Sequence, residues 1–305
     1  MHSIPNTLKN ASTRRPTIER LAPAKVNLAL AVGAPRPGDG YHPICSWMAP
    51  VSMHDQVHVT RLEDDRLSRY ALMWHEDAPV KSPINWPITK DLAVRAHHLL
   101  ERETGRTLPL QLRLTKRIPV GGGLGGGSSD AAAMLTAVNE LFSLSIPAQR
   151  MAQLALELGS DVAFFLHGGP AVVEGVGERV TPVGRTEAEL VLVFPDFGCP
   201  TGQVYRAFDE IGPAPLRDAD VHALAVRGAV TAGALFNDLA EPAIRTAPRL
   251  SEVQSRAAEI TRTPVHITGS GSTLFAVAES GQAETLAAQL NDQLEGCVCR
   301  AVRLL

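Results

Sequence analysis

Residues 118–142 read IPVGGGLGGGSSDAAAMLTAVNELF, and the rest of the sequence is best interpreted outward from this stretch. Six of the seven residues from 121 to 127 are glycine. Apolar residues then recur at helical spacing, which predicts an amphipathic helix behind the glycines: Met134, Leu135, Val138, Leu141 and Phe142. Ser128, Ser129 and Asp130 are residue types that commonly begin a helix. The sequence therefore predicts a glycine-rich loop that runs directly into a helix N-terminus.

A glycine-rich loop in front of a helix is a common form of phosphate site. Glycine lets the backbone approach an anion closely and adopt positive φ values. The free amide groups and the positive end of the helix dipole attract negative charge. The alternative is a flexible surface loop, but a solvated loop gains nothing from so many glycines, each of which costs conformational entropy. We therefore expect residues 119–129 to bind phosphate.

Three better-known phosphate and nucleotide motifs fit this chain less well. The string G-x-G-x-x-G from residue 121 matches a dinucleotide-binding loop, but a second helix is predicted where that fold needs a strand and an acidic residue. The string G-x4-G from residue 122 is followed by Ser128, where a Walker A loop has lysine. The D-F-G at 196–198 spells the metal-binding triplet of protein kinases, but no H-R-D precedes it.

The remaining sequence mixes strands and helices without a repeating strand–helix rhythm. Alternating or compact apolar stretches predict strands over 21–32, 44–52, 56–60, 108–116, 189–195, 263–268 and 273–278, with two shorter pieces in 168–183. Helices are expected over 91–103, 147–158 and 283–294, and proline-broken helices over 203–250, whereas residues 62–88 look irregular and polar. The pattern predicts an α+β chain with a flexible lead (1–18), an N-terminal domain (19–180) and a C-terminal domain (181–305).

Composition narrows the function classes. The chain has 305 residues with 29 basic and 32 acidic side chains, a net charge of −3. That balance lacks the basic footprint of a protein that binds nucleic acid or an anionic membrane. No apolar run approaches the roughly 18 residues of a membrane span, and the first residues lack the apolar core of a secretory signal. We expect a cytoplasmic protein with a small-molecule substrate and neither a nucleic acid nor a membrane as partner.

The cysteines and histidines show no metal-binding pattern in the sequence. The four cysteines are too few for a disulfide framework, and no second pair accompanies Cys297 and Cys299. Because these two are separated by one residue, they fit alternate positions of a strand. None of the ten histidines has carboxylates or cysteines at ligand spacing, so solvated or core histidines are the expectation.

Three motifs occur in the order found in the GHMP kinase superfamily, which this chain resembles. PVGGGLGGGSSDAAA at 119–133 is similar to the phosphate loop of that superfamily, PAKVNLALAV at 23–32 to its first motif, and ITGSGSTLFAV at 267–277 to its third. DGYH at 39–42 and LGSDV at 158–162 resemble the branch that acts on a cytidine diphosphate sugar alcohol. The resemblance extends from about residue 20 to 300.

The resemblance implies a fold and an activity. The fold is the two-domain α+β GHMP kinase fold, with an N-terminal domain like domain 2 of ribosomal protein S5 and a C-terminal ferredoxin-like α/β sandwich. The activity is phosphorylation, with ATP and Mg²⁺, of the 2-hydroxyl of a methylerythritol unit in non-mevalonate isoprenoid precursor biosynthesis, by a monomer or weak homodimer. Phosphoryl transfer depends mainly on positioning and charge neutralisation. Spacing assigns no acidic residue to the Mg²⁺ ion, and Ser128 and Ser129 are candidate ligands.

The resemblance also assigns residues to the phosphoryl transfer. Lys25 matches the catalytic lysine and Asp161 the catalytic aspartate, which either accepts the hydroxyl proton or orients the hydroxyl. A nearby ammonium keeps the aspartate ionised and stabilises developing alkoxide charge. The plain alternatives are a solvated lysine on an edge strand and an aspartate that caps the following helix. The loop that matches the ATP-phosphate site consists of Pro119, Val120, Gly121, Gly122, Gly123, Leu124, Gly125, Gly126, Gly127, Ser128 and Ser129.

Four residues are candidates for binding the substrate. Tyr41 and His42 match the position where the superfamily branch holds cytosine, and Tyr205 is our candidate for a second stacking ring. Asn27 lies two positions beyond Lys25 on the same predicted strand face, so it is a candidate hydrogen-bond partner. Two alternatives stay open: another GHMP enzyme, such as a homoserine or mevalonate kinase or a decarboxylase, and a non-catalytic protein of the same fold that binds a nucleotide or a protein.

Overall fold

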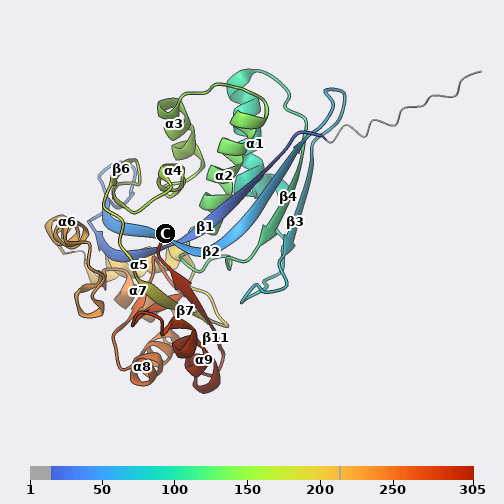
Figure 1. The fold of residues 1–305 in the computed structure, drawn as a ribbon. Coiled ribbons are helices and arrows are strands. Elements are labelled where there is room, and N and C mark those ends of the chain that lie inside the picture. Colours follow the sequence, from blue (N-terminus) through green and yellow to red (C-terminus); the bar gives the residue numbers. More distant parts are fainter. Residues whose placement is uncertain (1–14, 213) are drawn as a thin grey trace, which may run out of the picture.

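The computed structural model describes residues 15–212 and 214–305. In these residues, eleven strands form two sheets, and helices cover their outer faces (Figure 1). This arrangement confirms the predicted α+β class. Most of the predicted flexible lead, residues 1–14, lies outside the described residues, and the first strand already begins at Thr17.

The larger sheet has seven strands. They are β1 (Thr17–Val32), β2 (Ile44–Arg61), β3 (Arg69–Trp74), β4 (Leu110–Lys116), β5 (Ala171–Gly175), β6 (Arg179–Pro182) and β8 (Phe236–Asn237). The order is β3-β4-β2-β1-β8, with β5 paired to β2 and β6 paired to β5. The long antiparallel pair of β1 and β2 is the backbone of this sheet, and register shifts interrupt it after Pro23 and after Asn27.

Two expectations about this sheet were wrong. Residues 44–52 and 56–60 form one strand, β2, rather than two separate pieces, because the chain stays extended through the polar residues between them. Residues 62–88 are not wholly irregular, since β3 pairs in parallel with β4 at the sheet edge. Its sequence RYALMW alternates exposed and half-buried residues, but both faces carry apolar side chains, so the period-two contrast is weak.

The smaller sheet has four antiparallel strands in the order β11-β7-β10-β9. They are β7 (Glu189–Pro195), β9 (Val265–Ile267), β10 (Leu274–Ala278) and β11 (Cys297–Arg303). In chain order this sheet reads 4-1-3-2, the arrangement of a ferredoxin-like unit. Cys297 and Cys299 lie on β11, as their spacing predicted.

The helices lie outside the two sheets. They are α1 (Leu92–Thr104), α2 (Gly126–Leu141), α3 (Ala148–Leu158), α4 (Val162–His167), α5 (Thr201–Ile211), α6 (Asp218–Arg227), α7 (Ala240–Thr246), α8 (Arg249–Thr261) and α9 (Ala283–Gln293), with short 3-10 turns at Ile88–Lys90 and Ala232–Ala234. Helices α1–α3 lie above the larger sheet and α8 and α9 below the smaller one (Figure 1). None of the helices within the described residues is long and apolar enough to cross a membrane.

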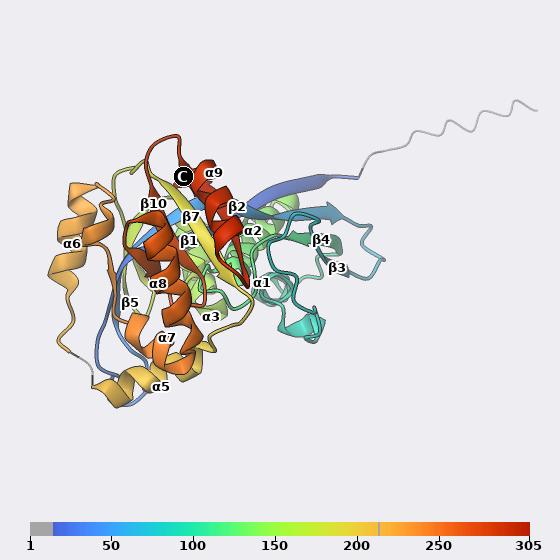
Figure 2. The same cartoon turned by 90° about the horizontal axis from the view of Figure 1, so that it is seen from below.

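Three large apolar cores and one small cluster around Met48 and Phe164 hold these layers together in the described residues. One lies between α1–α4 and the larger sheet, and one lies between the two sheets, with α6 closing its side. The third joins the smaller sheet to α5, α7, α8 and α9 (Figure 2). Strand β8, which lies in the region predicted to be helical, pairs in parallel with β1. β8 and α6 come after residue 181 in the sequence but pack on β1 and β2, which come before residue 180. The predicted domain boundary between residues 180 and 181 therefore stays a prediction.

Candidate active site

The glycine loop enters α2 without a side-chain cap. Helix α2 begins at Gly126, with Gly125 at its N-cap position in a left-handed conformation (φ +70°) that favours glycine. The expectation that Ser128, Ser129 and Asp130 begin the helix was therefore wrong, because the backbone turns three residues earlier. In the described chain, no side chain accepts a hydrogen bond from the first-turn amides. These amides remain available to an anionic ligand.

The loop is pressed between β1 and the turn at 268–271. At Gly123, which also has a positive φ (+76°), an added Cβ would lie 2.3 Å from the Thr268 carbonyl oxygen. The backbone amide of Lys25 donates to the Leu124 carbonyl at 3.0 Å. The first, second and third sequence motifs therefore meet at this loop. The Asn237 side chain donates to the carbonyls of Ile267 and Gly269 and so holds the third motif in place.

A buried ionic cluster joins the two ends of the loop. Lys116, at the end of β4, donates to Asp55 at 2.5 Å and to Asp130 on α2 at 2.6 Å, and all three side chains are at least 95% buried. Asp55 also accepts from the backbone amides of Arg117 and Ile118. Burial alone would lower the pKa of Lys116, but the two carboxylates outweigh it and raise that pKa. Sequence reasoning missed this cluster.

Lys25 lies at the floor of a cavity beside the loop. Its Nζ donates to the Asn27 Oδ1 atom and to the Gly123 carbonyl, each at 2.6 Å. It is 4% exposed, so it is not a solvated lysine on an edge strand. Burial lowers the pKa of Lys25, and the charge of Asp161 only partly opposes that effect. Both hydrogen-bond partners of the Lys25 ammonium are uncharged oxygens, so they do not neutralise its positive charge.

Asp161 faces Lys25 across the cavity. Its Oδ2 atom lies 3.9 Å from the Lys25 Nζ, and 29% of its side chain is exposed. Asp161 occupies the N-cap position of α4, but within the described residues its carboxylate accepts no capping hydrogen bond. The capping alternative therefore fails on geometry. The carboxylate stays open to a hydroxyl that enters the cavity.

Asn27 is largely occupied by protein contacts. Its amide oxygen accepts from Lys25 and from the Thr268 hydroxyl, and its amide nitrogen donates to Ser46 at 2.8 Å. These contacts fix the direction in which the Lys25 ammonium points. Direct binding of the substrate by Asn27 stays a prediction.

One cavity of about 630 Å³ collects the predicted residues from segments far apart in the chain. Among the predicted residues, those that line it are Lys25, Asn27, Tyr41, His42, Gly123, Gly125, Ser128, Asp161 and Tyr205. The other loop residues lie behind or beside it in the described structure. Leu124 and Ser129 are almost fully buried, whereas Val120 is half exposed. The cavity therefore combines an anion-binding loop, a lysine–carboxylate pair and aromatic rings.

The aromatic end of the cavity contains an acidic residue that sequence reasoning missed. The His42 ring lies 5.0 Å from the Tyr205 ring, and Tyr41 is 63% exposed at the mouth. Burial, with a smaller contribution from Asp161, raises the pKa of Tyr205 to about 12, so it is a neutral phenol. Asp209 on α5 lies 3.4 Å from the His42 Nε2 atom. Its position four residues after Tyr205 puts it on the same helix face, and that spacing was the available signal.

The comparisons with known proteins agree with this geometry. Residues 91–169, which contain the loop and Asp161, match the family described as GHMP kinases N terminal domain. The chain is 41% identical over 236 residues to the 4-diphosphocytidyl-2-C-methyl-D-erythritol kinase of Symbiobacterium thermophilum, covering 76% of this chain and 80% of that one. It is 40% identical over 283 residues to the same kinase of a Nocardioides species, covering 88% and 92%.

A solved structure extends the likeness to three dimensions. The crystal structure of a 4-(cytidine 5'-diphospho)-2C-methyl-D-erythritol kinase superposes with a TM-score of 0.75 at 35% identity, covering 94% of this chain and 99% of that one. This likeness over nearly the whole of both chains confirms the GHMP kinase fold. On sequence, fold and cavity together, the chain belongs to the 4-diphosphocytidyl-2-C-methyl-D-erythritol kinase family of GHMP kinases.

Proposed function

We propose that this chain transfers the γ-phosphoryl group of ATP to the 2-hydroxyl of 4-diphosphocytidyl-2-C-methyl-D-erythritol, a step in non-mevalonate isoprenoid precursor biosynthesis. The observation that carries this proposal is the Lys25–Asp161 pair at 3.9 Å in a cavity that the glycine loop and the aromatic rings also line. A phosphate site and a nucleobase-sized aromatic site on either side of one carboxylate suit a kinase whose acceptor carries a nucleotide.

Asp161 and Lys25 divide the work on the hydroxyl. Asp161 accepts the hydroxyl proton or holds the hydroxyl in line through a hydrogen bond. Lys25 stabilises the negative charge that develops on the attacking oxygen. Asn27 and the Gly123 carbonyl hold the ammonium toward that oxygen. Positioning of this kind supplies most of the catalysis in phosphoryl transfer.

The residues of the loop fit the phosphates of ATP. Ser128, in the first turn of α2, lines the cavity together with the left-handed Gly123 and Gly125. The first-turn amides of α2 have no side-chain cap. The Ser129 hydroxyl is buried and has no hydrogen-bond partner among the described residues, which leaves an oxygen donor unused beside the loop. Mg²⁺ prefers such hard oxygen donors together with phosphate oxygens. We therefore propose Ser128 or Ser129 as its protein ligand, where the ion would neutralise phosphate charge.

The aromatic end of the cavity suits the cytosine ring. Tyr41 and Tyr205 offer ring faces for stacking, which is worth about 1–3 kcal/mol per base in single-strand binders. The Nδ1 atom of His42 lies 2.9 Å from the Gly33 carbonyl oxygen, which fixes the ring. We assign Tyr41, His42 and Tyr205 to cytosine binding on this basis.

A coupled ADP-release assay tests the proposal. The full chain is supplied with Mg-ATP and 4-diphosphocytidyl-2-C-methyl-D-erythritol, and homoserine, mevalonate and galactose serve as control acceptors. Turnover with the cytidyl substrate alone is the expected result. Turnover with a control acceptor instead would keep the phosphate site and overturn the cytosine assignment, and silence with all four from folded, ATP-binding protein would favour the non-catalytic alternative.

The location, oligomeric state and partners of this chain are proposals as well. We propose a cytoplasmic monomer or weak homodimer that has no nucleic-acid or membrane partner. Light scattering on the eluting protein at micromolar concentration measures its mass directly. A stable higher oligomer would contradict this proposal.

A further inference from the structure

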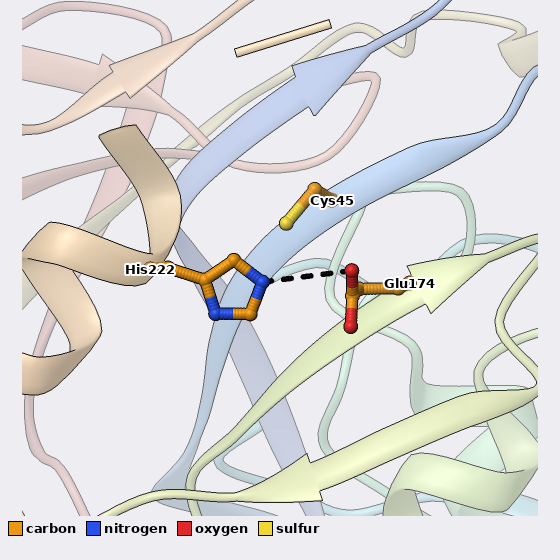
Figure 3. Close-up of side chains that lie close together, drawn as sticks. All are labelled: Cys45, Glu174 and His222. Atoms are coloured by element: carbon orange, nitrogen blue, oxygen red, sulfur yellow. Dashed lines mark ion pairs between the residues drawn. The ribbon is translucent and has the colours of Figure 1, made fainter. Parts of the chain in front are cut away.

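Three side chains of metal-ligating type meet on the far side of the segments that line the cavity. They are Cys45 on β2, Glu174 on β5 and His222 on α6, and they point toward one another (Figure 3). One ligand atom from each lies within 4.8 Å of the other two. In the sequence these residues are 48 to 177 positions apart, so no local spacing revealed the group.

The fold brings the three residues together for clear reasons. Cys45 and Glu174 are directly opposite each other in the antiparallel β2–β5 ladder, so their side chains share one face of the sheet. Helix α6 packs on that face through Val221, Leu224 and Ala225. His222 follows Val221 and extends from the helix over Glu174. The group is thus built on two strands and a helix rather than on a loop.

The distances suit a tetrahedral ion. Ligand atoms about 2.0–2.3 Å from a zinc ion are roughly 3.3–3.8 Å apart at tetrahedral angles. The His222 Nε2 atom lies 3.5 Å from the Glu174 Oε1 atom, inside that range. The Cys45 sulfur needs a shift of at most about 1 Å to reach the same range. The donor set consists of a sulfur, an imidazole nitrogen and a carboxylate oxygen. Zinc binds such a set more readily than magnesium or calcium, which prefer oxygen ligands alone.

A second group of three side chains of metal-ligating type among the described residues differs in its hydrogen bonding. His97, His98 and Glu101 also lie close together, but both ring nitrogens of His97 are occupied. They lie 2.8 Å from the Tyr70 hydroxyl and 2.9 Å from the Leu108 carbonyl. In contrast, the one hydrogen-bond contact of Cys45 Sγ within residues 15–212 and 214–305 is a long one, 4.0 Å to the Asp218 carbonyl. The Cys45 sulfur is therefore available to a metal ion, whereas both ring nitrogens of His97 already have hydrogen-bond partners.

Access and charge also favour an ion at the Cys45 group. Cys45 is fully buried, whereas 22% of the Glu174 side chain and 46% of the His222 side chain are exposed, so the group opens to solvent on one side. A thiolate, a carboxylate and a neutral imidazole balance the charge of a divalent ion. Arg179 lies 3.7 Å from Glu174 and 3.8 Å from Glu178. If Glu174 binds the ion, Arg179 can still pair with Glu178.

We propose that Cys45, Glu174 and His222 form a zinc site, with water in the fourth position, that links α6 to strands β2 and β5 of the larger sheet. On binding, the Cys45 thiol releases its proton to solvent and the thiolate forms the Zn–S bond. Cys45 follows Ile44 in β2, so the two side chains point to opposite faces of the strand. Ile44 lines the cavity, and so does Val176, two residues beyond Glu174. Zinc would stabilise this wall of the substrate site without touching the substrate.

Zinc titration of the untagged full chain, after chelator treatment, tests the site. We expect one equivalent of zinc to bind and to raise the thermal midpoint of unfolding. His222→Ala, which alters a half-exposed side chain, is expected to weaken binding by roughly 100-fold or more and to abolish the thermal shift. The matched control is His98→Ala, which removes a half-exposed histidine 3.1 Å from Glu101 and leaves zinc binding unchanged.

A second readout identifies the sulfur ligand. Cobalt(II) bound in place of zinc gives a thiolate-to-metal charge-transfer band when a cysteine coordinates it, and Cys45→Ser removes that band. Cys199→Ser controls for loss of another buried thiol and keeps the band. The proposal is overturned if the wild-type chain binds zinc no more tightly than His222→Ala. It is equally overturned if the cobalt form has no thiolate band or keeps it in Cys45→Ser.

Discussion

Lys25 and Lys116 are both 4% exposed, but their surroundings give them opposite chemistry. Lys116 meets two carboxylates at 2.5 and 2.6 Å, and their charges raise its pKa in spite of burial. Lys25 meets an amide oxygen and a backbone carbonyl, and its nearest carboxylate is 3.9 Å away, so burial lowers its pKa. The Lys116 ammonium has carboxylate counter-ions within hydrogen-bond distance, whereas the Lys25 ammonium has none that close.

This difference shows that compensation, rather than burial, separates a structural lysine from a functional one. A buried charge with close partners contributes to a fixed framework and loses heavily if one partner is removed. A buried charge with neutral partners is costly to fold, and such costs are typical of functional sites. Lys116 links the two ends of the glycine loop, whereas we propose that the charge of Lys25 acts on the reacting oxygen. The predictions below test this contrast.

The largest effect is expected at the carboxylate opposite Lys25. Asp161→Asn removes the proton acceptor but keeps its shape, so kcat should fall by about 10²–10⁴-fold. The thermal midpoint should barely change, because the carboxylate makes no capping hydrogen bond. Asp196→Asn, at an exposed ion pair outside the cavity, is the matched control. Near-normal turnover of Asp161→Asn in the ADP-release assay would remove Asp161 from the mechanism.

Lys116→Met should damage stability more than any other lysine substitution. It leaves two carboxylates buried without their counter-ion, which typically costs about 3–5 kcal/mol of unfolding free energy. Urea unfolding measures this loss. Lys90→Met, at an exposed lysine, should stay within about 0.5 kcal/mol of the parent. Equal stability of the two variants would mean that the cluster around Lys116 is not a framework.

Lys25→Met should show the reverse pattern. Loss of the charge that stabilises the developing oxyanion should lower kcat by roughly 10²–10³-fold. Urea unfolding should change little, because the lost ammonium has only one distant carboxylate and was desolvated. The same two measurements on Lys25→Met and Lys116→Met therefore give opposite results if the comparison holds. A large loss of stability in Lys25→Met would show that both lysines are structural.

The aromatic end should contribute a smaller, binding-type effect. Tyr41→Ala removes an exposed ring, so the fold should be intact. The lost stacking free energy of about 1–3 kcal/mol should lower kcat/KM for the cytidyl substrate by roughly 5- to 150-fold. Tyr41→Phe keeps the stacking face and should stay near the parent. The KM for ATP should not move in either variant. If Tyr41→Phe fell as far as Tyr41→Ala, the hydroxyl rather than the ring would be the binding group.

The smallest effect is a shift of the alkaline limb of activity. Because the folded pKa of Lys25 lies below its ordinary 10.5, kcat/KM should decline with rising pH at a midpoint below 10.5. Between that midpoint and 10.5 the unfolded chain holds more protons at this site, so Lys25 makes the unfolding free energy rise with pH there.

Lys116 has the opposite sign. Its folded pKa is raised, so its stabilisation is fully present below 10.5 and is lost only as pH rises through the higher folded value. Urea unfolding of the parent and Lys25→Met at several pH values below 10.5 checks the sign for Lys25. A shallower slope in Lys25→Met is expected, and a steeper one would contradict the lowered pKa.

The features that were predictable from sequence are those with local causes. The glycine loop, the helix behind it and the strand with Lys25 each follow from spacing within about 25 residues, and the motif order extended them to Asp161 and Tyr41. Asp209 was within reach through its i, i+4 relation to Tyr205. The exact start of α2 was not, because consecutive glycines and serines offer several turns of similar cost.

The features that escaped sequence reasoning depend on tertiary contacts. Asp55 and Lys116 are 61 residues apart, and only the pairing of β2 with β4 brings them together. Cys45 and His222 meet because α6 packs on the face of the sheet that Cys45 and Glu174 share. Strand β8 has two residues, which is too few for any periodicity. In each case the individual residue looks ordinary in sequence, and the sheet register gives it a partner.

The parallel pairing of β8 with β1 has a consequence for synthesis on the ribosome. Val32 at the end of β1 receives its hydrogen-bond acceptor from Asp238, 206 residues later. At about 5–20 residues per second, the first motif waits roughly 10–40 s before that partner exists. During this time its sheet edge near Lys25 is open. The candidate active site is therefore among the last parts of the chain to close, because this strand waits for a partner from the C-terminal part of the sequence.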